Sequence, residues 1–277
     1  MRLFILLGLI VFSYTSFAQE NTELEQLVAE ISLDDLDQVS IDTKDQIFAS
    51  RISGDIYQYS SNGKQLNIFS PARQGRLQQL EAAWTVNIFS FSADLQEYRI
   101  LDRFMNTLAE KGFLNTSISL AKAATLGNNN TIWIWDESDL SIKSLDYRRD
   151  QVIQSQSLNM ILSGEKLEVL EIREFKNRLF MNVAGSGVYV FDNQANLIEK
   201  IPLVVEQQLC FFNEHLLWVE NGALMAISIE TQEKVLLAKL PYSDIGGIQT
   251  GQERLVLTSQ DKLYIFPMPE RLKSLEK

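Results

Sequence analysis

The chain has 277 residues, enough to bury a sizeable core, and its formal net charge is −11. An acidic surface repels a phosphate backbone, so this composition excludes general nucleic-acid binding. One cysteine and one histidine exclude an internal disulfide and a zinc site built from such residues. Cys210 lies in the apolar run QLCFF, which predicts a buried thiol.

Residues 1–18 have the pattern of a cleaved signal peptide. Arg2 supplies the positive charge, Leu3 to Phe12 are apolar, and small residues lead to a cut after Ala18. The apolar run is shorter than the roughly 20 residues that a membrane-spanning helix needs. The mature chain, 19–277, loses only the charge of Arg2 and is predicted to be a soluble periplasmic protein without an integral membrane segment, with secretion as the alternative.

Six similar units follow, each containing a clear apolar strand. Equivalent positions in these strands are 41, 44, 47, 37 and 39 residues apart: Phe48, Phe89, Trp133, Phe180, Leu217 and Val256. A second strand follows each after a short turn, most units add a third, and a weaker apolar run precedes each clear strand. The pattern predicts an all-β fold, a six-bladed β-propeller with four-stranded antiparallel blades.

Two stretches fit this pattern poorly. Residues 76–83 and 103–113 have helical spacing, and they fall where connections between blades are expected. For each of them a short helix and a loop both remain open.

The ring is predicted to close through the amino-terminal strand. The sixth unit stops at Pro267, and the prolines there argue against a fourth strand. The segment VAEISL, 28–33, has no other role and would complete the last blade and cover its exposed edge. The alternative is a disordered or helical tail. Residues 19–277 are therefore predicted to form one domain.

Three segments, 45–66, 130–146 and 177–203, share one form, which reads DQIFASRISGDIYQYSSNGKQL in the first. They resemble an exported six-bladed β-propeller family common in Bacteroidota and are loosely similar to NHL-type propellers. The resemblance spans essentially the whole mature chain. It implies the fold and the exported location, but it implies no activity and no catalytic residue.

The motifs of the common enzyme classes are missing. His215 begins a predicted strand and has no GxSxG element with it, and the sequence has no glycine-rich phosphate loop. A calcium-dependent lactonase-type hydrolase needs several inward oxygens, and nothing in the spacing selects the candidates Glu171, Glu174, Asp42 and Asp45. The chain is therefore predicted to be non-enzymatic, with no metal and no cofactor.

Four tryptophans and two arginines are the remaining candidates for binding. Trp133 and Trp135 share one strand face and are suited to a sugar-binding surface, but filling the space between blades is the favoured interpretation for both and for Trp218. Arg73 and Arg76 lie in the first inter-blade connection, which Trp84 ends. These arginines either pair locally with Glu81 or anchor an acidic group of a partner.

Together these features predict a non-enzymatic interaction scaffold in the periplasm. Its partners would be envelope proteins, in an assembly or secretion machine, and Arg73, Arg76 and Trp84 are the candidate binding residues. The alternatives are a carbohydrate or small-ligand binder that uses the mouth of the central channel, and the calcium-dependent lactonase-type hydrolase.

Overall fold

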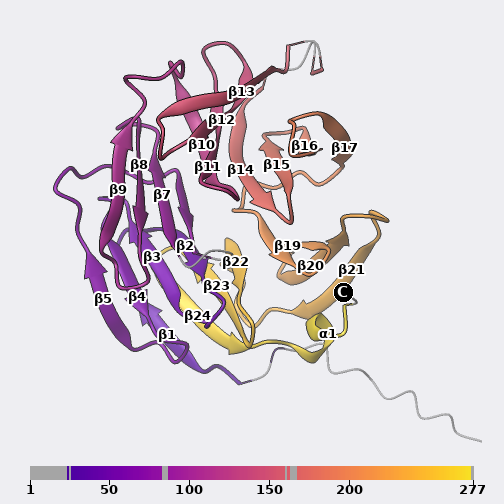
Figure 1. Ribbon diagram of the computed structural model, residues 1–277. Helices are drawn as coiled ribbons and strands as arrows, with labels where there is room; N and C mark the ends of the chain where they lie inside the picture. The colour runs from indigo at the N-terminus through magenta and orange to yellow at the C-terminus, as the bar shows by residue number, and fades with distance from the viewer. Residues whose placement is uncertain (1–23, 25, 83–86, 160, 163–166, 276–277) are drawn as a thin grey trace, which may run out of the picture.

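The computed structural model describes residues 24, 26–82, 87–159, 161–162 and 167–275, and it is a ring of six four-stranded antiparallel sheets (Figure 1). The predicted six-bladed β-propeller is confirmed. Among these residues, the innermost strands of neighbouring blades contact one another around a central axis at five junctions, those other than the one between blades 4 and 5. The predicted signal peptide, 1–18, lies outside the described residues.

The first three blades each run from an innermost to an outermost strand. Blade 1 consists of β2 (Leu36–Ile41), β3 (Ile47–Arg51), β4 (Ile56–Tyr59) and β5 (Gln65–Phe69). Blade 2 consists of β6 (Gln79–Glu81), β7 (Ile88–Ser92), β8 (Glu97–Leu101) and β9 (Thr107–Gly112). Blade 3 consists of β10 (Ala121–Leu126), β11 (Thr131–Asp136), β12 (Ser141–Asp146) and β13 (Gln151–Ser157).

The next two blades repeat this order. Blade 4 consists of β14 (Val169–Phe175), β15 (Arg178–Val183), β16 (Gly187–Phe191) and β17 (Leu197–Ile201). Blade 5 consists of β18 (Cys210–Phe212), β19 (His215–Glu220), β20 (Ala223–Ser228) and β21 (Lys234–Lys239).

Blade 6 combines the two ends of the chain. Its inner strands are β22 (Gly247–Thr250), β23 (Arg254–Ser259) and β24 (Lys262–Pro267), and its outermost strand is β1 (Ala29–Ser32). The strand β1 pairs antiparallel with β24, with Ile31 opposite Leu263, which confirms the predicted closure. After Pro267 the chain forms the short helix α1 (Glu270–Lys273), whose Leu272 is buried.

The helical alternative is wrong for the described part of residues 76–83 and 103–113, and the loop alternative holds only outside the strands found there. These stretches contain β6 and β9, which pair with β7 and β8. Helical spacing is a weak preference, and the hydrogen-bonding edge of the neighbouring strand overrides it in the folded ring.

Among the described residues, six apolar clusters form the core, one between each pair of adjacent blades. Between blades 1 and 2, for example, Phe48 and Ile56 pack with Leu80 and Ile88. The six equivalent positions found in the repeats are all buried, as are Trp135 and Trp218. The favoured interpretation of the tryptophans as core residues is therefore confirmed for those that the structure describes.

The turns before the outermost strands have a shared construction that the sequence repeats. In blades 2 and 4 an aspartate Oδ1 accepts hydrogen bonds from backbone N–H groups two and four residues later: Asp102 from Phe104 and Asn106, and Asp192 from Gln194 and Asn196. The residue before each asparagine has a positive φ, 69° at Met105 and 58° at Ala195. The side-chain acceptor therefore stabilises a turn that is otherwise strained.

The turns lie on two faces of the ring. The inner-turn face carries the turns from the innermost strand to the second and from the third to the outermost. The connection face carries the turns between the second and third strands and the inter-blade connections.

Candidate functional site

In each blade, one residue of the innermost strand pairs directly with the residue of the second strand that recurs in all six repeats, the series from Phe48 to Val256. The residues there are buried, and five of the six have polar or charged side chains; we call them the axial ring: Ser40, Glu81, Thr125, Arg173, Cys210 and Gln249. A buried polar group needs a hydrogen-bond partner, so these positions determine how the blades meet around the axis.

The first arc of the ring, in blades 1 to 3, bonds each blade to the next. In each case a side-chain oxygen accepts a hydrogen bond from a backbone N–H of the following blade or its innermost turn: Ser40 Oγ from Ala82 (2.8 Å), Glu81 Oε2 from Leu126 (3.3 Å) and Thr125 Oγ1 from Glu174 (3.1 Å). These bonds satisfy backbone groups that the sheets leave unpaired at the axis.

Arg173 links carboxylates of two blades across the channel. Its Nη2 lies 2.8 Å from Glu171 Oε1, and its Nε lies 3.5 Å from Glu81 Oε1. The Gln79 amide donates to both carboxylates, at 2.6 Å to Glu81 and 3.0 Å to Glu171. The other oxygen of Glu171 accepts the Leu209 N–H at 2.7 Å. One guanidinium thus pairs with two buried acids and balances the charge of one of them, and the Gln79 amide donates hydrogen bonds to both.

Burial raises the pKa of Glu81 to about 7, although the Arg173 charge acts in the opposite direction. Because Arg173 and Gln79 occupy their oxygens, Glu81 and Glu171 are poorly placed to bind calcium. No group of three or more His, Cys, Asp or Glu side chains in the described part of the chain could hold a metal ion.

The second arc, in blades 4 to 6, is less completely bonded. Cys210 Sγ lies 3.6 Å from Thr250 Oγ1, and Gln249 Nε2 is buried without a hydrogen-bond partner among the described residues. A cavity of about 350 Å³ opens here, which we call the axial cavity. Its lining comes from blades 1, 4, 5 and 6 and from α1: Ile41, Asp42, Thr43, Arg173, Lys176, Leu209, Phe211, Phe212, Asn213, Gln249, Thr250, Gly251, Gln252, Glu253 and Lys273.

A second cavity, of about 530 Å³, lies between blades 1 and 2 on the inner-turn face. Phe48, Ala82 and Ile88 line it with buried apolar surface, and Leu66 and Phe104 lie at its rim with 47% and 62% of their surface exposed. The basic residues Lys44 and Arg103 also line it. We call it the blade 1–2 cavity.

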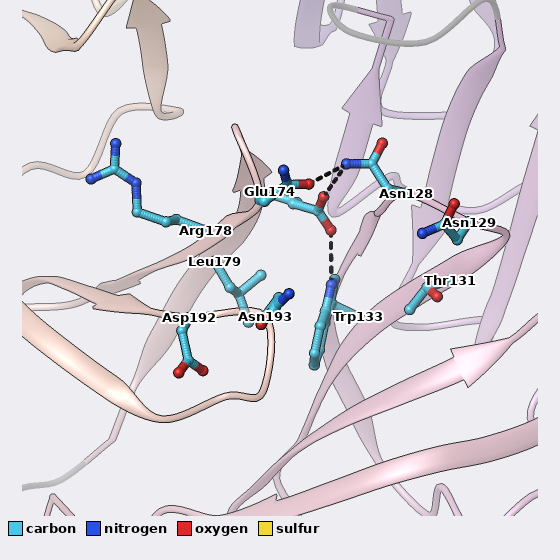
Figure 2. Close-up of a pocket in the computed structure, with 10 residues that line it drawn as sticks. Asn128, Asn129, Thr131, Trp133, Glu174, Arg178, Leu179, Asp192 and Asn193 are labelled. Atoms are coloured by element: carbon cyan, nitrogen blue, oxygen red, sulfur yellow. Dashed lines mark hydrogen bonds between the residues drawn. The ribbon is translucent and has the colours of Figure 1, made fainter.

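A third cavity, of about 180 Å³, lies between blades 3 and 4 (Figure 2). Figure 2 shows Glu174 bonded on one side to the Trp133 indole N–H, at 2.8 Å, and on the other to the Asn128 amide, at 3.0 Å. Burial raises the pKa of Glu174, against the effect of the Trp133 hydrogen bond. Asn129 and Thr131 add further polar groups to this blade 3–4 cavity.

Arg73 and Arg76 lie on the connection face and line none of these three cavities. They also do not line a further cavity of about 420 Å³ on that face, which lies between blades 4 and 5. Arg73 pairs with Glu97 at 3.3 Å, and Arg76 pairs through two nitrogens with Asp37, at 2.8 Å for the shorter contact. Local pairing with Glu81 is therefore wrong, because that carboxylate is buried at the axis with Arg173. Both arginines attach the first inter-blade connection to neighbouring strands; contact with a partner stays a prediction.

Trp84 lies outside the described residues, so its predicted binding role stays open. His215 begins β19, as predicted, and burial lowers its pKa. Cys210 is buried, as predicted, and burial raises its pKa to about 11, which leaves the thiol protonated and unreactive.

The four calcium candidates do not converge. Asp42 accepts hydrogen bonds from backbone groups of its own turn, and Asp45 accepts the N–H groups of Gln252, Glu253 and Arg254. Glu174 belongs to the blade 3–4 cavity, and Glu171 alone lies in the channel cluster. Asp42 thus holds its own turn, and Asp45 holds blade 1 to blade 6, so the four carboxylates do not form a calcium site.

Sequence reasoning missed Arg173, Gln249 and the axial ring. The sequence does contain a signal for these residues. In most repeats a polar residue occurs in the weaker apolar run, seven or eight positions before the recurring residue of the clear strand. Ser40 before Phe48 and Glu81 before Phe89 are examples. The innermost runs are short, however, and the period alone did not show which of their residues face the axis.

No family model matches the sequence, and no curated protein matches it. Solved structures match the fold. The WD40 domain of Pan2 from Neurospora crassa is 8% identical with a TM-score of 0.60, covering 89% of this chain and 98% of that one. BamB from Moraxella catarrhalis is 10% identical with a TM-score of 0.51, covering 88% and 97%.

A virginiamycin B lyase from Staphylococcus aureus is 12% identical with a TM-score of 0.55, covering 84% of this chain and 80% of that one. These neighbours show the β-propeller fold alone, and the resemblance to an exported Bacteroidota family stays a prediction. In the described part of the chain, no helix has the length and apolar character needed to cross a membrane. Function must therefore be argued from the residues of this chain.

Proposed function

We propose that this protein is a non-enzymatic protein-interaction scaffold of the periplasm, and that the blade 1–2 cavity is its principal contact with an envelope protein. Propellers commonly present loops of one face to other proteins, and three cavities here are lined by residues of the inner-turn face, against one of about 420 Å³ on the connection face. The periplasmic location is supported by the signal-peptide pattern of residues 1–18.

The observation that carries this proposal is the rim of the blade 1–2 cavity. Leu66 and Phe104 are largely exposed beside a buried apolar floor, so a partner side chain that enters the cavity gains apolar contact on several sides. The rim is also preorganised, because the Asn67 amide donates to the Phe104 carbonyl at 2.9 Å across the two blades.

Charge adds a second element of recognition. Lys44 and Arg103 line the same cavity, and the Arg103 guanidinium lies 4.8 Å from the centre of the Phe104 ring. Asp42 also lines the cavity, so the two cations exceed the carboxylates of the lining by one charge. On a chain with a net charge of −11, this favours a partner segment with an apolar side chain flanked by acidic residues.

Site-specific photo-crosslinking in intact cells tests the proposal. A crosslinker at position 104 should give one discrete adduct with an envelope protein, and Leu66→Ser should abolish it. A crosslinker at position 198 is the matched control, since Ile198 is 52% exposed on the outer strand of blade 4 and lines none of the three cavities. Equal adducts from both positions, or none from position 104, would refute the proposal.

The blade 3–4 cavity favours a second candidate, the binding of a hydroxyl-rich ligand such as a sugar. Amide, hydroxyl and carboxylate groups surround the edge of the Trp133 indole there (Figure 2). A thermal-shift screen with monosaccharides tests it. A shift that Asn129→Ala removes would support this function, and no shift with any sugar would exclude it.

A further inference from the structure

Gln249 breaks the pattern of the axial ring. Its side chain is 5% exposed, and its Nε2 has no hydrogen-bond partner among the described residues. In the first arc the equivalent residues Ser40, Glu81 and Thr125 all bond to the next blade. A buried amide without a partner costs free energy, so its presence requires a reason.

The axial cavity lies where this bond is missing. Gln249 lines it together with Arg173, which is also buried, and with Lys176 and Lys273. Arginine and lysine side chains have no acceptor capacity, and the orphan atom of Gln249 is a donor. These side chains come from two blades and from the helix α1, and all of them offer N–H groups.

The acidic residues of the lining are already bonded. Asp42 accepts the N–H groups of Lys44 and Gln46 at 2.8 Å each, and Glu253 lies 3.5 Å from Lys273.

The basic residues of the lining are paired as well: Lys176 bonds Glu214, and Lys273 lies 3.0 Å from Glu270. Gln249 Nε2 is therefore the buried side-chain donor of the described lining that lacks a partner. Each lysine ammonium carries three N–H groups and keeps at least one beyond its ion pairs, so a carboxylate is a chemical group that would use both kinds of donor.

The same cavity also has apolar walls. Leu209, Phe211 and Ile41 are buried and line it, and Phe212 lines it with partial exposure. Inorganic phosphate or sulfate gains nothing from such walls, whereas an organic acid places its hydrocarbon part against them. The volume of about 350 Å³ is suited to a small molecule and too small for a folded partner.

We propose that the axial cavity binds a small organic carboxylate, with Gln249 and Lys273 bonding the carboxylate group beside Arg173 and with Phe211 and Leu209 packing on its apolar part. This site is separate from the blade 1–2 cavity and does not depend on the scaffold proposal. It gives the buried amide of Gln249 the acceptor that the fold itself does not supply.

Isothermal titration of the full chain with sodium benzoate, butyrate and phenylacetate tests the proposal, with benzamide and inorganic phosphate as comparison probes. At least one carboxylate should bind saturably and raise the melting temperature, while benzamide and phosphate should not. Gln249→Leu and Lys273→Gln should each weaken that binding by about tenfold, as expected for the loss of a hydrogen bond to a charged group.

Lys262→Gln is the matched control, because Lys262 is also a half-exposed lysine paired with a carboxylate but lies on the connection face. It should leave carboxylate binding unchanged. The proposal would be overturned by no saturable binding of any carboxylate, by equal binding of benzoate and benzamide, or by binding that Gln249→Leu leaves intact. Binding of phosphate in preference to every carboxylate would likewise reject an organic ligand.

Discussion

The two arcs of the axial ring occupy equivalent positions in the fold, yet they are bonded in different ways. In blades 1 to 3, Ser40, Glu81 and Thr125 each accept a backbone N–H of the next blade. In blades 4 to 6, Arg173 pairs with Glu171 on its own strand and with Glu81 of blade 2, and Gln249 has an unpartnered amide among the described residues. The cavity at the axis lies beside the second arc.

The comparison shows that a repeated backbone does not require repeated polar contacts. Where a side-chain oxygen accepts a backbone N–H of the next blade, the junction is closed; where an amide donor has no partner, space and a donor remain. One arc is thus suited to stability and the other to binding. The following predictions test this division, from the largest expected effect to the smallest.

Arg173→Met should destabilise the protein most, by about 3–5 kcal/mol, because it leaves two buried carboxyl groups without their cation. Urea unfolding monitored by tryptophan fluorescence measures the change. Adding Glu171→Gln to this variant should recover part of the loss, since it removes one of the uncompensated acids. A loss below about 1 kcal/mol would mean that the cluster is not buried as described.

Stability should fall as the pH rises from 5 to 8. The folded-state pKa of Glu81, about 7, is above the ordinary value of 4.5, so the folded protein holds this proton more tightly than the unfolded chain. The stabilisation of the folded state by the proton on Glu81 is complete below pH 4.5. It is lost as the pH rises through 7, by an amount on the order of 2–3 kcal/mol. Unfolding at a series of pH values measures it. Glu81→Gln should flatten this part of the profile.

Thr125→Val and Gln249→Leu compare the two arcs directly. Thr125→Val leaves the Glu174 N–H without its acceptor and should cost about 1–2 kcal/mol. Gln249→Leu breaks no hydrogen bond within the described residues and should leave stability unchanged or raise it by up to about 1 kcal/mol. Equal losses in the two variants, measured by urea unfolding, would remove the distinction between the arcs.

Arg76→Gln should have the smallest effect, at most about 1 kcal/mol, because its ion pair with Asp37 is formed by a largely exposed guanidinium. Arg73→Gln should change stability even less, since its contact with Glu97 is longer, at 3.3 Å. Thermal unfolding at low and high salt measures both. If Arg76→Gln cost more than Thr125→Val, the connection face rather than the axis would dominate stability.

The sequence by itself determined the blades, because their signals are local. A period near 40 residues, the buried positions from Phe48 to Val256, and turns that begin with Asp102 or Asp192 all depend on neighbours within one hairpin. The closure by β1 also followed, since an unfinished last blade and an unused first strand are both visible in the chain. The helical spacing of residues 103–113 misled because only the neighbouring strand β8 shows that they are extended.

The tertiary structure alone decided which polar side chains meet. Gln79 and Glu171 are 92 residues apart in the chain, and Arg76 pairs with Asp37 rather than with the nearer Glu81. The orphan amide of Gln249 and the exposed rim formed by Leu66 and Phe104 likewise exist only when separate blades come together. A hydrogen bond across the axis depends on the curvature and closure of the whole ring, and short-range spacing contains no information about either.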